Sequence, residues 1–160
     1  MERTVDAESN VGTAARPGQF LTFALNEESY GLEILKVREI IGLMEITAVP
    51  EVPHYMKGVV NLRGKVIPVV DLRLKFGMPE ADYDEETCII VVNVNETLVG
   101  IIVDTVSEVV NLDEAQIEET PEFGGGHGGE FILGMAKVEE SVKILLDIDK
   151  VLDAGALGSF

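Results

Sequence analysis

Residues 58–76 read GVVNLRGKVIPVVDLRLKF. Two runs rich in valine, isoleucine and leucine flank Arg63-Gly64-Lys65, a pattern typical of a β-hairpin that turns at a glycine. Asp71 ends the second run, where an aspartate is expected to cap the short helix predicted over Leu72–Phe76. The stretch therefore predicts a β-rich fold, with Arg63 at the tip of an otherwise apolar hairpin.

The composition is typical of a globular protein. The chain has 160 residues, of which 46% are hydrophobic and 26% charged, enough for one domain or two small ones. Cys88 is the single cysteine, which fits a reducing compartment. No apolar run reaches the roughly 20 residues of a membrane span, and residues 1–18 lack the apolar core of a signal peptide. We expect a cytoplasmic protein that does not insert directly into membranes.

The charge distribution is strongly uneven. A net charge of −17 argues against binding to nucleic acids or to acidic lipid headgroups. Residues 76–136 hold no lysine or arginine, whereas residues 36–75 hold seven basic and four acidic residues, a local net charge of +3. The basic region is either an uneven solvated surface or a docking face for an acidic or mixed-charge protein.

Three further pairs of apolar runs are predicted to form hairpins around short polar turns. They are Gln19–Leu25 with Tyr30–Ile34, Cys88–Val94 with Leu98–Val103, and Phe131–Val138 with Val142–Ile148. Residues 35–43 fit either a helical turn or a bent strand, and single helical turns are predicted at 54–57 and 112–119. Because the strands are short and turns are frequent, small barrels or a sandwich are expected.

The same unit occurs twice along the chain. Residues 31–41 align without gaps on 100–110, and residues 58–72 resemble 134–148. This repeat predicts two small tandem β-barrels packed on each other. Only the first copy carries the basic region. We therefore assign the features that both copies share to the fold, and the turn that bears Arg63 to function.

Residues suited to catalysis or metal binding do not converge in this sequence. His54 and His127 cannot form a zinc site with Cys88 at any usual spacing. Gly124–Gly129 matches G-x-G-x-x-G, but it neither follows a strand nor opens a helix, so no nucleotide is expected there. We predict a protein that is not an enzyme and that has no metal or cofactor.

Arg63 has two interpretations from the pattern alone. One is a solvated arginine in an exposed turn. The other is a planar guanidinium directed at a carboxylate, either on a partner or within the chain, where Glu39 is a candidate.

Several phrases of the sequence carry a family resemblance. The most specific are KGVVNLRG at 57–64 and its sequel IPVVDL at 67–72, and others lie at 19–23, 30–40 and 99–104. Together they resemble the CheW family of bacterial chemotaxis coupling proteins, over about residues 19–153.

The resemblance implies a mostly β fold of two five-stranded SH3-like β-barrels around a shared hydrophobic core. Its approximate halves would be residues 19–79 and 87–153, with exchange of strands between them allowed. A disordered tail is expected at 1–18 and a loose end at 154–160.

The resemblance also implies a non-catalytic adaptor. Such proteins join the cytoplasmic tips of methyl-accepting chemoreceptors to the regulatory domain of the histidine kinase CheA, in membrane-associated arrays. Carried over residue by residue, receptor or kinase binding is expected at Val37, Glu39, Gly58, Asn61, Leu62, Arg63 and Gly64, and structural glycines at Gly100 and Gly134. Two alternatives stay open: a chemosensory array with a non-flagellar output, and a small-ligand-binding β-barrel.

Overall fold

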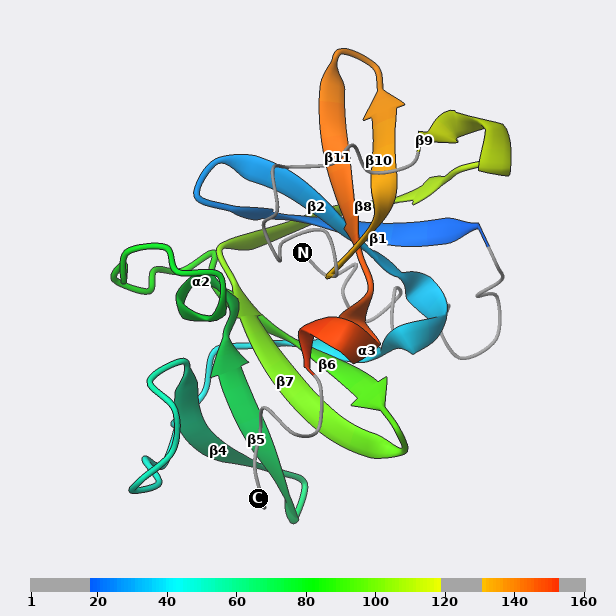
Figure 1. Ribbon diagram of the computed structural model, residues 1–160. Helices are drawn as coiled ribbons and strands as arrows, with labels where there is room; N and C mark the ends of the chain where they lie inside the picture. The colour runs from blue at the N-terminus through cyan, green and yellow to red at the C-terminus, as the bar shows by residue number, and fades with distance from the viewer. Residues whose placement is uncertain (1–17, 119–130, 153–160) are drawn as a thin grey trace.

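The computed structural model describes residues 18–118 and 131–152. These residues form two β-sheets in which most neighbouring strands are antiparallel, with the six-stranded sheet above the five-stranded one in Figure 1. The predicted mostly β fold with two β units is confirmed. The Gly124–Gly129 loop, with His127, the tail up to residue 17 and the end at 154–160 lie outside the described residues.

The six-stranded sheet has the order β8-β1-β2-β11-β10-β9. Its strands are Thr105–Asn111, Gln19–Leu25, Glu28–Glu33, Ser141–Leu146, Ile132–Val138 and Ile117–Glu118. Neighbours run antiparallel except β11 and β2, which are parallel.

The five-stranded sheet has the order β3-β6-β7-β5-β4. Its strands are Val37–Gly42, Cys88–Val94, Thr97–Val103, Lys65–Asp71 and Met56–Leu62. Here β5 and β7 form the parallel pair. The chain beyond β3 comes back to β4 through a bridge between Thr47 and Val59.

Short helices follow or connect the strands. They are the 3-10 turns Ile34–Lys36 (η1) and Glu114–Gln116 (η2) and the α-helical turns Leu72–Lys75 (α2) and Ile148–Val151 (α3). Asp71 caps α2, as predicted, and Asp147 caps α3; each accepts hydrogen bonds from backbone N–H groups of the first turn.

The chain passes from one sheet to the other twice. It crosses from the six-stranded to the five-stranded sheet between β2 and β3, and back again between β7 and β8. Each sheet is therefore built from strands of both sequence repeats, which is the exchange that the resemblance allowed. The two halves at 19–79 and 87–153 stay a prediction as folding units.

The repeat is visible in the backbone contacts. The Asp71 N–H donates to the Tyr55 carbonyl, and the Asp147 N–H donates to the Phe131 carbonyl, each at 2.8 Å. The two donors are 76 residues apart in sequence, and so are the two acceptors. The hairpins β4–β5 and β10–β11 are thus equivalent down to the residue that precedes each of them.

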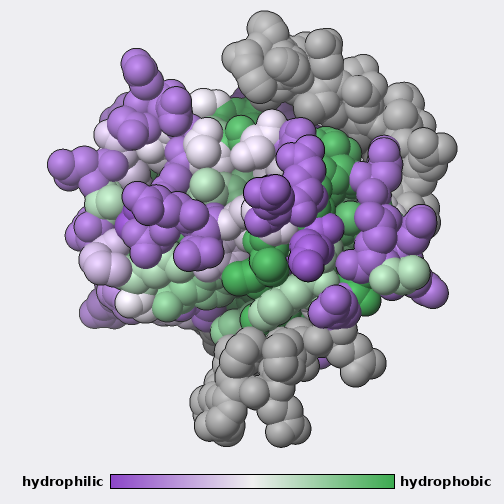
Figure 2. Space-filling model, turned by 90° about the horizontal axis from the view of Figure 1, so that it is seen from above, coloured by the Kyte–Doolittle hydropathy of each residue, from purple (hydrophilic) through white to green (hydrophobic). Residues whose placement is uncertain are grey.

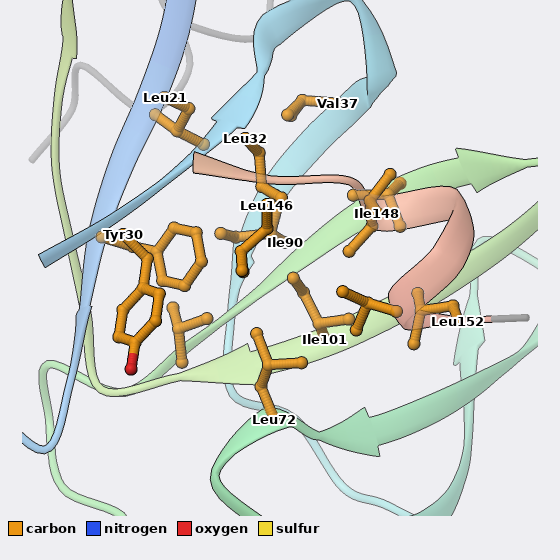
Figure 3. Packing of buried hydrophobic residues seen from close by; sticks show 14 of the residues in the cluster. Leu21, Tyr30, Leu32, Val37, Leu72, Ile90, Ile101, Leu146, Ile148 and Leu152 are labelled. Atoms are coloured by element: carbon orange, nitrogen blue, oxygen red, sulfur yellow. The ribbon is translucent and has the colours of Figure 1, made fainter. Parts of the chain in front are cut away.

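One large cluster of buried residues lies between the sheets. It combines residues from strands of both sheets with residues of both α-helical turns, and Figure 3 labels Leu32, Ile90, Ile101, Leu72 and Ile148 among them. Burying one such side chain contributes roughly 1.5–3 kcal/mol. The shared core is therefore what holds the two β units together.

The sequence patterns misjudge two short segments and leave a third open. Residues 54–57 do not form a helical turn, because β4 already begins at Met56, which is buried and pairs with Val70. The ambiguous 35–43 segment splits into the end of η1 and strand β3. Strand β8 is not predicted because most of its side chains are exposed and show no clear alternation.

Candidate functional site

The tip of the β4–β5 hairpin holds Arg63 in a left-handed backbone conformation. Its φ is 53°, and Gly64 follows at 87°. The Gly64 N–H donates to the Asn61 side-chain oxygen at 2.8 Å, which closes the turn from within. Asn61 therefore shapes the tip, and the Arg63 side chain leaves the hairpin from a fixed position.

The Arg63 side chain forms an ion pair with Glu39 of β3. The Arg63 guanidinium donates to the Glu39 carboxylate, the intramolecular partner that the sequence suggested. The arginine side chain is 69% exposed, whereas that of Glu39 is only 6% exposed. A buried carboxylate is costly without a hydrogen-bonded partner, so Arg63 stabilises Glu39 while much of its own surface faces solvent.

The other predicted binding residues differ in accessibility. Val37 on β3 is 3% exposed and belongs to the main core, so its side chain is not a free surface anchor. Leu62 is half-buried and packs on the smaller core of the five-stranded sheet, whereas Asn61 and Gly64 are exposed.

A hollow of about 230 Å³ lies beside Val37, lined by Leu35, Lys36, Val37, Arg38 and Asn93. Leu35 is 57% exposed there, although it is a large apolar residue. The resemblance predicted receptor or kinase binding at Val37 and did not single out Leu35. The signal was available: in the sequence ILKV, one apolar side chain of a single helical turn must face away from the core.

The predicted glycines occupy tight places in the sheets. A Cβ on Gly58 would lie 2.0 Å from the Thr47 carbonyl oxygen, and one on Gly134 would lie 2.8 Å from that of Glu118. Both glycines sit at β-bulges of equivalent strands. Gly100 faces an Ile89 methyl group at 2.8 Å. These contacts give Gly58, Gly100 and Gly134 a packing role, whereas Gly64 meets nothing within 4 Å.

Two further side chains with reactive groups, Cys88 and His54, lie among the described residues. Burial raises the pKa of the Cys88 thiol to about 11, which keeps it protonated and unreactive. His54 contacts the edge of the Tyr55 ring. Within the described ranges, no three histidine, cysteine or acidic residues lie together in a way that could hold a metal ion. No helix in these ranges is long and apolar enough to cross a membrane.

Exposed apolar side chains lie at several places among the described residues. Figure 2 shows one face on which hydrophobic residues gather between hydrophilic ones. Large apolar side chains that are exposed in the described ranges are Leu35, Leu43, Val66, Val109, Leu133 and Val142. Val66 and Val142 occupy equivalent places on the two repeated hairpins, 76 residues apart. Each hairpin therefore presents an apolar side chain just after its turn.

The model of the CheW-like domain family matches residues 19–156, which is most of the chain. The chain belongs to the CheW family. The chemotaxis protein CheW of Klebsiella aerogenes is 43% identical over 136 residues, covering 85% of this chain and 82% of that protein. Protein FrzA of Myxococcus xanthus is 30% identical over 142 residues, covering 86% and 88%.

A solved CheW structure shares the fold. The scaffolding protein TtCheW from Thermoanaerobacter tengcongensis has a TM-score of 0.79 and 35% identity, covering 88% of this chain and 91% of that chain. CheW proteins are non-catalytic scaffolds of chemotaxis, so this chain is a CheW-type coupling protein and not an enzyme. The protein-protein role agrees with a site that offers a charged tip, a hollow and apolar patches.

Proposed function

We propose that this protein couples methyl-accepting chemoreceptors to the histidine kinase CheA, as a cytoplasmic scaffold recruited to membrane-associated receptor arrays. The observation that carries the proposal is the Arg63–Glu39 pair, in which an exposed arginine is fixed over a buried carboxylate. The turn and β3 hold that arginine in place. A preorganised, charged surface of this kind gives a docking site orientation and register.

The receptor tip is proposed to dock at the hollow beside Leu35. Receptor tips of this class are helical hairpins, and a helix docks through apolar anchors that enter a groove. Leu35 supplies exposed apolar surface at the hollow, while Lys36 and Arg38 line it with cationic groups. Val37 supports the wall from within the core and does not contact the receptor through its side chain.

The kinase regulatory domain is proposed to dock on an apolar face of the five-stranded sheet. Val66 on β5 is 65% exposed, and Leu43 just beyond β3 is also exposed. Exposed apolar groups beside a charged tip match the usual composition of protein interfaces, which combine an apolar centre with a polar rim. Asn61, Leu62 and Arg63 would form part of that rim.

Co-purification tests the proposal. The full chain is mixed with a CheA regulatory domain and with a receptor tip fragment, separately and together, and complexes are separated by size-exclusion chromatography. We expect a binary complex with each partner and a ternary complex with both. Absence of both binary complexes would overturn the coupling function.

A second candidate is a chemosensory array whose output is not flagellar. The observation that favours it is the relative named FrzA, which matches most of the chain although its name differs from that of the chemotaxis proteins. Both candidates share the scaffold mechanism. Deleting the gene and scoring swimming motility separates them, because only the flagellar array predicts a loss of directed swimming.

A further inference from the structure

Ion pairs lie at both places where the chain crosses between the sheets. At the β7–β8 crossover, Arg73 of α2 holds both carboxylate oxygens of Asp104, with Nε–Oδ1 and Nη2–Oδ2 distances of 2.9 Å. Asp104 Oδ2 also accepts the Asn26 N–H at 2.8 Å, and the Asp104 N–H donates to the Ala24 carbonyl at 3.1 Å. Asp104 thereby ties α2, which follows the five-stranded sheet, to the β1–β2 hairpin of the six-stranded sheet.

The β2–β3 crossover carries a second pair. Lys36 in η1 contacts Asp149 of α3, with Nζ–Oδ2 at 2.8 Å. α3 follows β11 of the six-stranded sheet, while η1 leads directly into β3 of the five-stranded sheet. η1 also follows β2 of the six-stranded sheet directly, so this pair ties α3 to the segment that carries the chain from one sheet to the other. In Figure 1, α2 and α3 both lie at the level where the two sheets meet.

The repeat relates the two pairs and reverses their polarity. Arg73 and Asp149 are 76 residues apart and occupy the second position of their helical turns. Lys36 corresponds to position 105 in the first alignment, which is next to Asp104. The helix supplies the cation in one pair and the anion in the other. The helical position is the same in both pairs, whereas the crossover partner is shifted by one residue and the two charges are exchanged.

From this geometry we infer that the two pairs, Arg73–Asp104 and Lys36–Asp149, act as pins that set the orientation of one β-sheet relative to the other. The buried core supplies most of the cohesion between the sheets, but apolar contacts are non-directional and permit small sliding. A hydrogen-bonded ion pair at each crossover adds the direction that the core lacks. Because Lys36 also lines the hollow beside Leu35, its pin fixes one wall of that hollow.

Distances between spin labels on the two sheets test the pins. In a Cys88→Ala background, cysteines replace Lys137 on β10 and Lys65 on β5, which are exposed and belong to different sheets. Double electron–electron resonance then gives the distribution of distances between the sheets. The parent should show one narrow distribution, and circular dichroism confirms that each variant keeps its fold.

Four pin variants are compared with the parent. Arg73→Gln and Lys36→Met each remove one pin without adding repulsion, and Arg73→Asp places like charges together at the first crossover. Arg73→Asp combined with Asp104→Arg restores an ion pair with the polarity found at the other crossover. We expect a broader or shifted distribution in the three single variants, and a return toward the parent distribution in the double variant.

The outcomes decide the inference. Broadening in the single variants, with recovery on charge exchange, supports pins that set orientation. Parent-like narrow distributions in folded Arg73→Gln and Lys36→Met would overturn it, because the core alone would then fix the sheets. If Arg73→Asp does not fold, Arg73→Gln and Lys36→Met still decide the question.

Discussion

The largely exposed guanidinium of Arg63, at the tip of the β4–β5 hairpin, pairs with the buried carboxylate of Glu39 on β3. The pair joins segments 24 residues apart in sequence. One partner faces solvent and the other does not, so the two substitutions are expected to have different consequences. This difference separates the contribution of Arg63 to stability from its proposed contribution to docking.

Arg63→Gln should lower the free energy of unfolding by about 1 kcal/mol, because it removes the ion pair that a largely solvated arginine makes with Glu39 and keeps a polar side chain at the turn. Arg63→Glu should cost more, because it places a second carboxylate beside Glu39. Urea unfolding of both variants, with Glu39→Gln and the double variant Glu39→Gln/Arg63→Gln, gives the coupling energy. Loss of the folded state in Arg63→Gln would show that the arginine is chiefly structural.

Gly58 and Gly64 should respond differently to alanine. A Cβ at Gly58 meets the Thr47 carbonyl at 2.0 Å, and its φ is 145°, so Gly58→Ala should cost about 3 kcal/mol. Gly64 has free space and a φ of 87°, so only backbone strain of about 1 kcal/mol is expected for Gly64→Ala. Thermal unfolding measures both. Equal losses would contradict a packing role that is specific to Gly58.

Asp104 should contribute to acid sensitivity. Partial burial acts to raise its pKa, but the hydrogen bonds from Arg73 and the Asn26 N–H, with the charge of Arg73, outweigh it and hold the pKa below its ordinary value of 3.8. A carboxylate with a lowered folded pKa stabilises the fold above its unfolded pKa, and this contribution is lost as the pH falls through the folded pKa.

Asp104→Asn should therefore be less stable than the parent at neutral pH, and the difference should shrink as the pH falls below 3.8. Denaturant unfolding from pH 7 down to the acid limit measures it, with Glu85→Gln, at an exposed position, as the control. A stability difference that stays constant across this range would contradict the assignment.

Lys36→Arg should stabilise the protein. Lys36 contacts Asp149 Oδ2, while Oδ1 of the same carboxylate is buried and has no hydrogen-bond partner among the described residues. An arginine fork can donate to both oxygens, as Arg73 does at the other crossover, and one added hydrogen bond is worth about 0.5 kcal/mol. Lys150→Arg, on the exposed side of α3, is the matched control. A lower melting temperature for Lys36→Arg would show that the longer side chain does not fit.

The fold was largely predictable because its signals are local. Each hairpin combines apolar strands with a short polar turn. Asp71 and Asp147, at the ends of strands, indicate the helical turns that follow. The sequence did not predict which strands exchange between the halves. The pairing of β8 with β1 joins residues about 85 positions apart, and such a distant pairing leaves no local pattern in the sequence. Strand β8 was missed for a related reason. Most of its side chains are exposed, so its sequence lacks the alternation of apolar and polar residues, although its backbone pairs with β1.

The site was predictable in part. Arg63 stood out because the second repeat has Glu139 in its place, and Glu39 followed as a carboxylate within reach. The burial of Val37 and the exposure of Leu35 depend on how η1 turns into β3, which the ambiguous 35–43 pattern did not settle. The crossover pairs were not predicted, because each joins residues that only the exchange of strands brings together.

Affinity for the partners is the most direct test of the docking surface. Arg63→Gln and Glu139→Gln, at equivalent turns of the two hairpins, are titrated with a CheA regulatory domain and with a receptor tip fragment, and their melting temperatures are recorded. Arg63→Gln should bind at least one partner about tenfold more weakly, or about 1.4 kcal/mol, while Glu139→Gln binds as the parent does. Parent-like affinity of Arg63→Gln for both partners would contradict an Arg63-centred docking surface.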